Sequence, residues 1–220
     1  MAIFDFLGPV MVGPSSSHTA GAVKIGYIAR KLMNDDIKKA EILLHGSFAD
    51  TGKGHGTDKA LVAGLLGMKA DDDRIPNSFE IANEVGLEFS IGNITLRDVH
   101  PNTVLLRLTS EDKRSLEIIA SSIGGGQIKI CKLDGLDVNF SGNSPTLIVH
   151  NYDQPGHVTE VTSMLAHKSI NIATMQLYRS YRGGNAVMVI ECDQEVPLES
   201  IGWLKKLEGI IKVSYLSQEE

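Results

Sequence analysis

The sequence predicts an α+β protein built from two domains. Helix-type apolar spacing comes first in the chain, a series of strand-like runs follows, and a tight alternation of strand and helix patterns ends it. The length of 220 residues suits one large domain or two small ones, at roughly 100–200 residues per domain. Turn-forming residues at 139–145 mark the boundary, so we expect domains at 1–142 and 146–220.

In the first domain, the helices precede the strands. Apolar residues recur at spacings of three and four between residues 19 and 33, and Ser17 or Thr19 can supply the N-cap oxygen. The other expected elements are helices after Thr57 and at 79–85, and strands at 40–44, 87–96, 103–109, 115–121, 127–133 and 136–140. This order favours a largely antiparallel sheet covered by helices.

The second domain has the element order βαββαβ of the ferredoxin-like split unit. Strands are expected at 146–150, 170–178, 185–192 and 210–216, and helices at 158–167 and 197–207. Pro197 opens the second helix, as proline often does at a first helical position. Trp203 and the aliphatic residues around it are expected in the core.

Composition and charge exclude several classes of protein. Apolar residues make up 42 % and charged residues 22 %, as in an ordinary globular protein. A net charge of −6 gives no general attraction for nucleic acid or for an anionic membrane. No apolar run reaches the ~20 residues of a membrane span, and the N-terminus lacks the basic region of a secretory signal. We therefore expect a cytoplasmic protein with no nucleic-acid or membrane partner.

The chain has 2 cysteines, Cys131 and Cys192. Two cysteines cannot form a disulfide framework, a four-thiolate zinc site or a four-cysteine iron–sulfur site. We expect no metal site in this chain.

The segment 13–21 gathers hydroxyl groups and a histidine where a helix begins. The residues are Ser15, Ser16, Ser17, His18 and Thr19. Free N–H groups at a helix N-terminus, together with hydroxyls, are well suited to hold a carboxylate or a phosphate. The alternative is a serine-rich loop that ends in an N-cap, with His18 merely exposed. A second histidine motif further along the chain favours the binding site.

That second motif spans residues 45–58 and alternates glycines around Lys53 and His55. Glycine lets the backbone approach a ligand closely, and a histidine can act as general acid or base near neutral pH. The rival interpretation is a metal site that uses His18, His45 and His55 with Asp50 or Asp58. No HExxH-type spacing supports it. The Walker frame and the Gly-x-Ser-x-Gly elbow are also missing.

The motifs at 13–19, 46–58 and 64–67 together resemble the β chain of iron–sulfur-dependent L-serine dehydratase. The resemblance implies a β subunit with an allosteric substrate-binding-type domain followed by an ACT domain. It implies a cysteine-rich α subunit that carries a [4Fe–4S] cluster, no pyridoxal phosphate, and conversion of L-serine to pyruvate and ammonia.

The same resemblance implies roles for residues of both motifs. His18 and His55 are the candidates to remove the proton on the α carbon, and His45 is assigned a structural role. The residues expected to hold the substrate carboxylate are Ser15, Ser16, Ser17 and Thr19.

Residues 146–216 resemble an ACT domain, in particular the serine-sensing module of phosphoglycerate dehydrogenase. The positions that hold the effector there correspond to Asn151, Asp153 and Asn171, although that enzyme has His and Asn at the first two. The alternative is an ACT unit that only dimerises. Lone ACT domains pair edge to edge, which hides strand edges, so we expect self-association.

The rival function for the whole chain is a stand-alone regulatory protein that senses serine.

Overall fold

The structure is a computed structural model that describes residues 10–218, apart from the side chain of Lys53. The fold is mixed α and β with two sheets, which confirms the α+β class. The chain divides into two compact units, Met1–Asp134 and Gly135–Glu220. The division therefore comes before the turn-rich segment 139–145, at a turn in which Asp134 and Gly135 both have positive φ. Within residues 10–218, no helix has the length and apolarity needed to span a membrane.

The sheet of the first unit is largely antiparallel, as expected. Its strands are β1 (Ile37–His45), β2 (Glu88–Asn93), β3 (Thr103–Ser110), β4 (Ser115–Gly124) and β5 (Gln127–Leu133), in the order β2-β1-β3-β4-β5. Only the β1–β2 pair among these is parallel, because helices connect the two strands. Alternate residues of β1, such as Ile42 and Leu44, are buried in the core.

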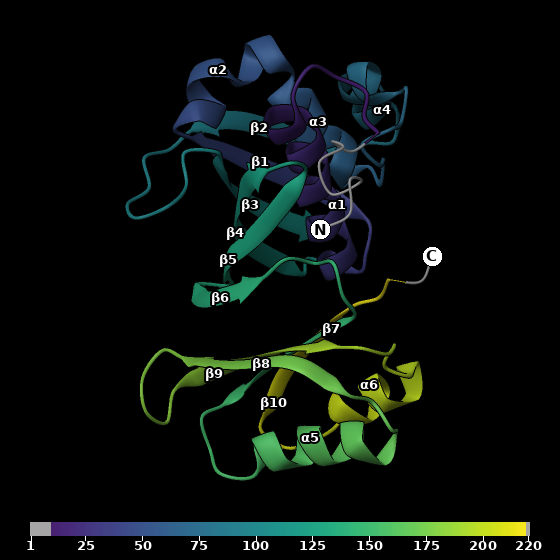
Figure 1. Cartoon of the computed structure of the whole chain (residues 1–220), viewed down its shortest axis with the longest axis vertical. Coiled ribbons are helices and arrows are strands. Elements are labelled where there is room, and N and C mark those ends of the chain that lie inside the picture. The colour runs from purple at the N-terminus through teal and green to yellow at the C-terminus, as the bar shows by residue number, and fades with distance from the viewer. Residues whose placement is uncertain (1–9, 219–220) are drawn as a thin grey trace, which may run out of the picture. The chain divides into compact units, whose positions relative to one another are not determined.

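Two helices of the first unit pack against each other through glycines. A short π-helical turn (Ser16–Ala20) leads into α1 (Gly21–Met33), and α3 (Thr57–Leu65) lies beside α1 (Figure 1). A Cβ atom on Gly64 would lie 2.1 Å from the Val23 carbonyl oxygen, and one on Gly26 would lie 2.4 Å from that of Leu61. Both positions therefore need glycine, which gives the 64–67 motif a packing role.

The segment from residue 47 to 55 forms a helix that the sequence does not predict. This helix, α2 (Ser47–His55), includes glycines that we expect to let the backbone approach a ligand closely. Gly46 precedes the helix with a φ of 55°, and Gly56 ends it in the left-handed region with a φ of 68°. Both flanking conformations favour glycine. The low helix propensity of Gly52 and Gly54 hid this helix from sequence analysis. Helix α4 (Ser78–Glu84) completes the connection to β2.

The second unit has the expected βαββαβ elements, preceded by β6 (Leu136–Phe140). They are β7 (Thr146–Tyr152), α5 (His157–His167), β8 (Ile172–Arg179), β9 (Asn185–Cys192), α6 (Leu198–Leu204) and β10 (Ile210–Leu216). The strands follow the order β10-β7-β9-β8, with every neighbouring pair antiparallel. Helices α5 and α6 lie on one face of this sheet (Figure 1). Val161 and Leu165 of α5 pack there against Leu147 and Ile190.

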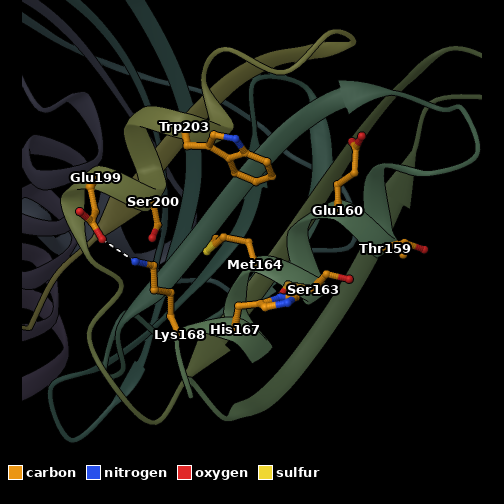
Figure 2. A pocket seen from close by; sticks show the side chains of 9 residues that line it. All are labelled: Thr159, Glu160, Ser163, Met164, His167, Lys168, Glu199, Ser200 and Trp203. Atoms are coloured by element: carbon orange, nitrogen blue, oxygen red, sulfur yellow. Dashed lines mark hydrogen bonds and ion pairs between the residues drawn. The ribbon is translucent and has the colours of Figure 1, made fainter.

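Trp203 is not a core residue, contrary to expectation. Ser200, Ile201 and Leu204 form the buried face of α6, and Trp203 lies at its margin with 45 % of its surface exposed. It lines an open groove of about 690 Å³ between α5 and α6. Figure 2 shows the indole over this groove and the Lys168–Glu199 ion pair at one end of it.

Candidate active site

The two histidine motifs meet in the first unit. His18 lies in the π-helical turn before α1, and His55 is the last residue of α2. Their ring centroids are 5.0 Å apart, with a tilt of 44° between the ring planes. His55 is exposed and His18 is half-buried. The fold therefore brings together the two residues that we expected to share one site.

Hydrogen bonds from α2 fix the His18 ring. Its Nε2 atom lies 3.2 Å from Ser47 Oγ and 3.1 Å from Thr51 Oγ1. The Phe48 ring contacts it edge-on at a centroid distance of 5.4 Å, and Phe48 is fully buried. The first two turns of α2 thus set the position of the imidazole.

The serine-rich turn is tied to α2 through Thr19. Its hydroxyl donates to the His55 carbonyl over 3.2 Å, and only 3 % of the residue is exposed. Ser15 caps the turn, because its Oγ accepts the His18 N–H at 3.1 Å. Of the four hydroxyl residues expected to hold a carboxylate, these two therefore already have structural hydrogen bonds.

Ser16 and Ser17 are the remaining hydroxyl residues of the turn, and both are half-buried. Further along, the N–H groups of Thr19 and Ala20 donate to the Ser15 carbonyl. The first N–H groups of a helix have no acceptor within that helix, so they can donate to other groups. Those of Ser16 and Ser17, with the adjacent hydroxyls, can receive an anionic group.

Burial lowers the pKa of His18 below its usual value of 6.5. A hydrogen bond with the Ser47 backbone opposes this shift by raising the pKa, and the nearby charge of His55 lowers it further. The result favours a neutral imidazole near neutral pH. A neutral imidazole can accept a proton as a general base.

The rival metal site is not assembled in the part of the chain that the structure describes. No group of three or more His, Cys, Asp or Glu side chains lies close enough there to hold a metal ion. His45 instead accepts the Leu96 N–H at Nδ1 over 3.2 Å and so anchors the segment after β2. Asp58 accepts the N–H of Lys59 at 2.8 Å.

The residues of this chain also do not fit an iron–sulfur cluster. The chain has 2 cysteines, Cys131 on β5 and Cys192 on β9, whereas a four-cysteine cluster needs four. Cys192 is only 1 % exposed, and burial raises its pKa to about 11. Cluster ligation needs thiolates, which such an environment disfavours.

The expected effector residues lie in the second unit and already have partners within the chain. Asn151 is buried and donates from Nδ2 to the Tyr152 carbonyl at 2.6 Å. Asp153 accepts the Gly183 N–H at 2.9 Å and a hydrogen bond from Arg179 at 3.0 Å. These hydrogen bonds hold the pKa of Asp153 below its usual value, and the bond from Gly183 has the largest effect.

One copy of the chain does not bring all three effector residues together. Strands β7 and β8 both pair with β9 in antiparallel fashion. Asn151 pairs with Ala186 at one end of β9, whereas Asn171 precedes Ile172, which pairs with Cys192 at the other end. Asn171 donates there from Nδ2 to Asp193 at 2.6 Å. Asn171 therefore lies at the opposite end of the sheet from Asn151 and Asp153.

Sequence analysis missed Ser47, Phe48 and Thr51. A signal was present, because Ser47, Thr51 and His55 follow at intervals of four and therefore share one face of a helix. That spacing has meaning only once residues 47–55 are known to be helical.

A family model matches the first unit, and known proteins match most of the chain. The family described as serine dehydratase beta chain matches residues 2–132. A probable L-serine dehydratase, beta chain, of Bacillus subtilis (strain 168) is 41 % identical over 98 % of both chains. An L-serine dehydratase, beta chain, of Peptoniphilus asaccharolyticus is 40 % identical over 87 % of this chain and 86 % of that one. A D-3-phosphoglycerate dehydrogenase of B. subtilis is 25 % identical over 89 % of this chain and 37 % of its own length.

Proposed function

Since this chain belongs to the serine dehydratase beta chain family, we propose that it is the β subunit of an enzyme that converts L-serine to pyruvate and ammonia. The single observation that carries the proposal within the fold is the approach of His18 and His55 to 5.0 Å. A serine-rich turn lies directly beside that pair. Together they offer a proton acceptor and an anion-binding turn for one small amino acid.

We assign the removal of the proton on the α carbon of serine to this pair of histidines. A neutral His18 is a competent base, and His55 is the second candidate. The carboxylate of serine would bind the N–H groups and hydroxyls of Ser16 and Ser17. Ser15 and Thr19 support that turn through their bonds to His18 and His55. Loss of the α proton and the β hydroxyl yields aminoacrylate, and hydrolysis of its imine form yields pyruvate and ammonia.

We propose that the reaction needs a separate α subunit. The resemblance implies a [4Fe–4S] cluster rather than pyridoxal phosphate, and the cysteines of this chain do not suit a cluster. The α subunit would therefore supply the cluster and the groups that release the hydroxyl. The names of the relatives, which denote β chains, support this division of labour.

We propose further that the second unit is an ACT domain in the cytoplasmic enzyme. Its βαββαβ elements and the strand order β10-β7-β9-β8 support this assignment. Because Asn151 and Asp153 lie at the opposite end of the sheet from Asn171, an effector site with all three requires two copies of the chain. Self-association through this unit would build that site.

The test is anaerobic co-purification of the chain from its native cell extract, followed by assays for iron, sulfide and pyruvate formation from L-serine. We expect a complex with a cysteine-rich partner that carries the iron, and activity only in that complex. A chain that binds serine but recovers neither partner nor activity would instead be an amino-acid sensor. Turnover by the purified chain alone would also contradict the proposal.

A further inference from the structure

The hydroxyl of Thr51 has one proton, and a carbonyl group of α2 fixes the direction in which this proton points. Thr51 Oγ1 lies 2.9 Å from the Ser47 carbonyl oxygen, one turn earlier in α2. A carbonyl oxygen only accepts, so Thr51 must donate this hydrogen bond. The hydroxyl then has only lone pairs to offer to any other partner.

That constraint determines the proton on His18. Nε2 of His18 lies 3.1 Å from the same Thr51 oxygen. Because Thr51 can only accept there, Nε2 must donate and must carry a hydrogen. In a neutral imidazole one ring nitrogen is protonated and the other accepts. The lone pair of His18 therefore resides on Nδ1.

Ser47 supports the same arrangement. Its Oγ lies 3.2 Å from Nε2 of His18, so two hydroxyl oxygens from successive turns of one helix meet the same ring nitrogen. Ser47 and Thr51 face His18 from α2, and Phe48 limits the position of the ring by edge contact. Both side-chain hydrogen bonds of the ring thus use Nε2.

We propose that Thr51, assisted by Ser47, is a positioning residue that holds His18 in the Nε2–H tautomer and makes Nδ1 its basic atom. The tautomer follows from the hydrogen bonds of α2 alone. Its catalytic consequence rests on the function proposed above: Nδ1 is the atom that takes the α proton of serine if His18 is the base. The proposal gives Thr51 a role that acts through His18.

The tautomer is measured by long-range ¹H–¹⁵N NMR of the full chain with ¹⁵N-labelled histidine. His18→Gln identifies the His18 signals by their disappearance. We expect the wild-type chain to show a protonated Nε2 and an unprotonated Nδ1 at His18. Thr51→Val is expected to mix the tautomers, because valine removes the acceptor while keeping the shape. Thr51→Ser is expected to restore the wild-type pattern.

The chain offers a matched control for these variants. Thr162 of α5 makes the same bond one turn back, with its hydroxyl donating to the Val158 carbonyl at 2.8 Å. Thr162→Val therefore removes an equivalent hydrogen bond from a helix of the second unit. We expect it to leave the His18 signals unchanged.

Two NMR results would overturn the proposal. One is a wild-type His18 protonated at Nδ1, and the other is an unchanged tautomer in Thr51→Val combined with Ser47→Ala.

Serine turnover by the complex supplies the second measurement. We expect kcat to fall about tenfold or more in Thr51→Val and to recover in Thr51→Ser. An unchanged kcat would contradict the positioning role. A wild-type complex that never dehydrates serine would contradict the proposed function, whereas the NMR result decides the tautomer without any activity.

Discussion

The two units treat their candidate ligand residues in opposite ways. In the first unit, His18 and His55 come from separate motifs and meet at a centroid distance of 5.0 Å. In the second unit, Asn151, Asp153 and Asn171 are close in sequence, yet Asn171 lies at the opposite end of the sheet from the other two. The two histidines therefore meet within one copy of the chain, whereas Asn171 does not meet Asn151 within one copy. This difference predicts that the two sites respond differently to mutation and to mixing of variants.

The largest expected effect is the loss of activity on removal of His18. His18→Ala in the complex should lower kcat by about 10²–10⁴-fold, the usual contribution of a general base. Pyruvate formation from L-serine measures it. His45→Ala serves as a comparison, since His45 anchors the segment after β2 instead of facing the site. A His18→Ala enzyme with full kcat would remove this residue from the chemistry.

Mixing of variants tests whether the second site needs two copies. Asp153→Ala and Asn171→Ala should each abolish effector binding when studied alone. In a mixed dimer one site has both intact residues and the other has neither. Random 1:1 mixing makes about half of the dimers mixed, so the mixture should regain about a quarter of the wild-type sites. Calorimetry with L-serine as the probe measures the recovered binding. If the mixture binds no better than either variant, the site does not combine these residues across copies.

The helix packing under the first site should be sensitive to a single methyl group. Gly64→Ala places a Cβ atom 2.1 Å from the Val23 carbonyl oxygen, and overpacking of this kind costs about 1–3 kcal/mol. Denaturant unfolding followed by circular dichroism measures the free energy of unfolding. The chain has 1 tryptophan, Trp203, and its fluorescence reports on the second unit. We expect the dichroism transition to shift more than the fluorescence transition. Equal stability of wild type and variant would contradict the packing argument.

The smallest expected effect concerns Gly54, which lies inside α2 with nothing within 4 Å of the position that a methyl group would take. Gly54→Ala should raise the free energy of unfolding by about 0.5–1 kcal/mol, because alanine favours the helix. If a ligand or the α subunit approaches the backbone here, the same variant lowers activity. Gly202→Ala, in α6 with equally open surroundings, is the matched control and should leave activity unchanged. A destabilised Gly54→Ala chain would contradict the open surroundings.

Much of the fold could be predicted because local patterns and packing agree. The predicted strands at 185–192 and 210–216 match β9 and β10, since turn residues bound both strands. The apolar residues are continuous at 186–190 and alternate with polar residues in β10. Helix α2 could not be predicted, because two glycines lower its intrinsic propensity and the fold stabilises it instead. The prediction for Trp203 was wrong for a related reason. Its hydrophobicity predicts burial, but its position at the margin of a short helix leaves it exposed.

The candidate site could be predicted only in part. His18 and His55 stand out because histidines beside glycines and serines are unusual in a packed core. Ser47 and Thr51 did not stand out, because their four-residue spacing toward His55 has meaning only in a helix. The buried hydroxyl of Thr19 was assigned to a carboxylate, yet it donates to the His55 carbonyl. Sequence patterns identify chemical groups, whereas the fold decides which groups bind each other.

The central claim is that a site completed by His55 in the first unit performs serine dehydration. The most direct test compares kcat for pyruvate formation in complexes with His55→Ala and His167→Ala. Both histidines end helices, α2 and α5, and both are exposed, so the two variants disturb the chain alike. We predict a loss of at least about 10²-fold for His55→Ala and wild-type turnover for His167→Ala. Equal turnover in the two variants would contradict the claim.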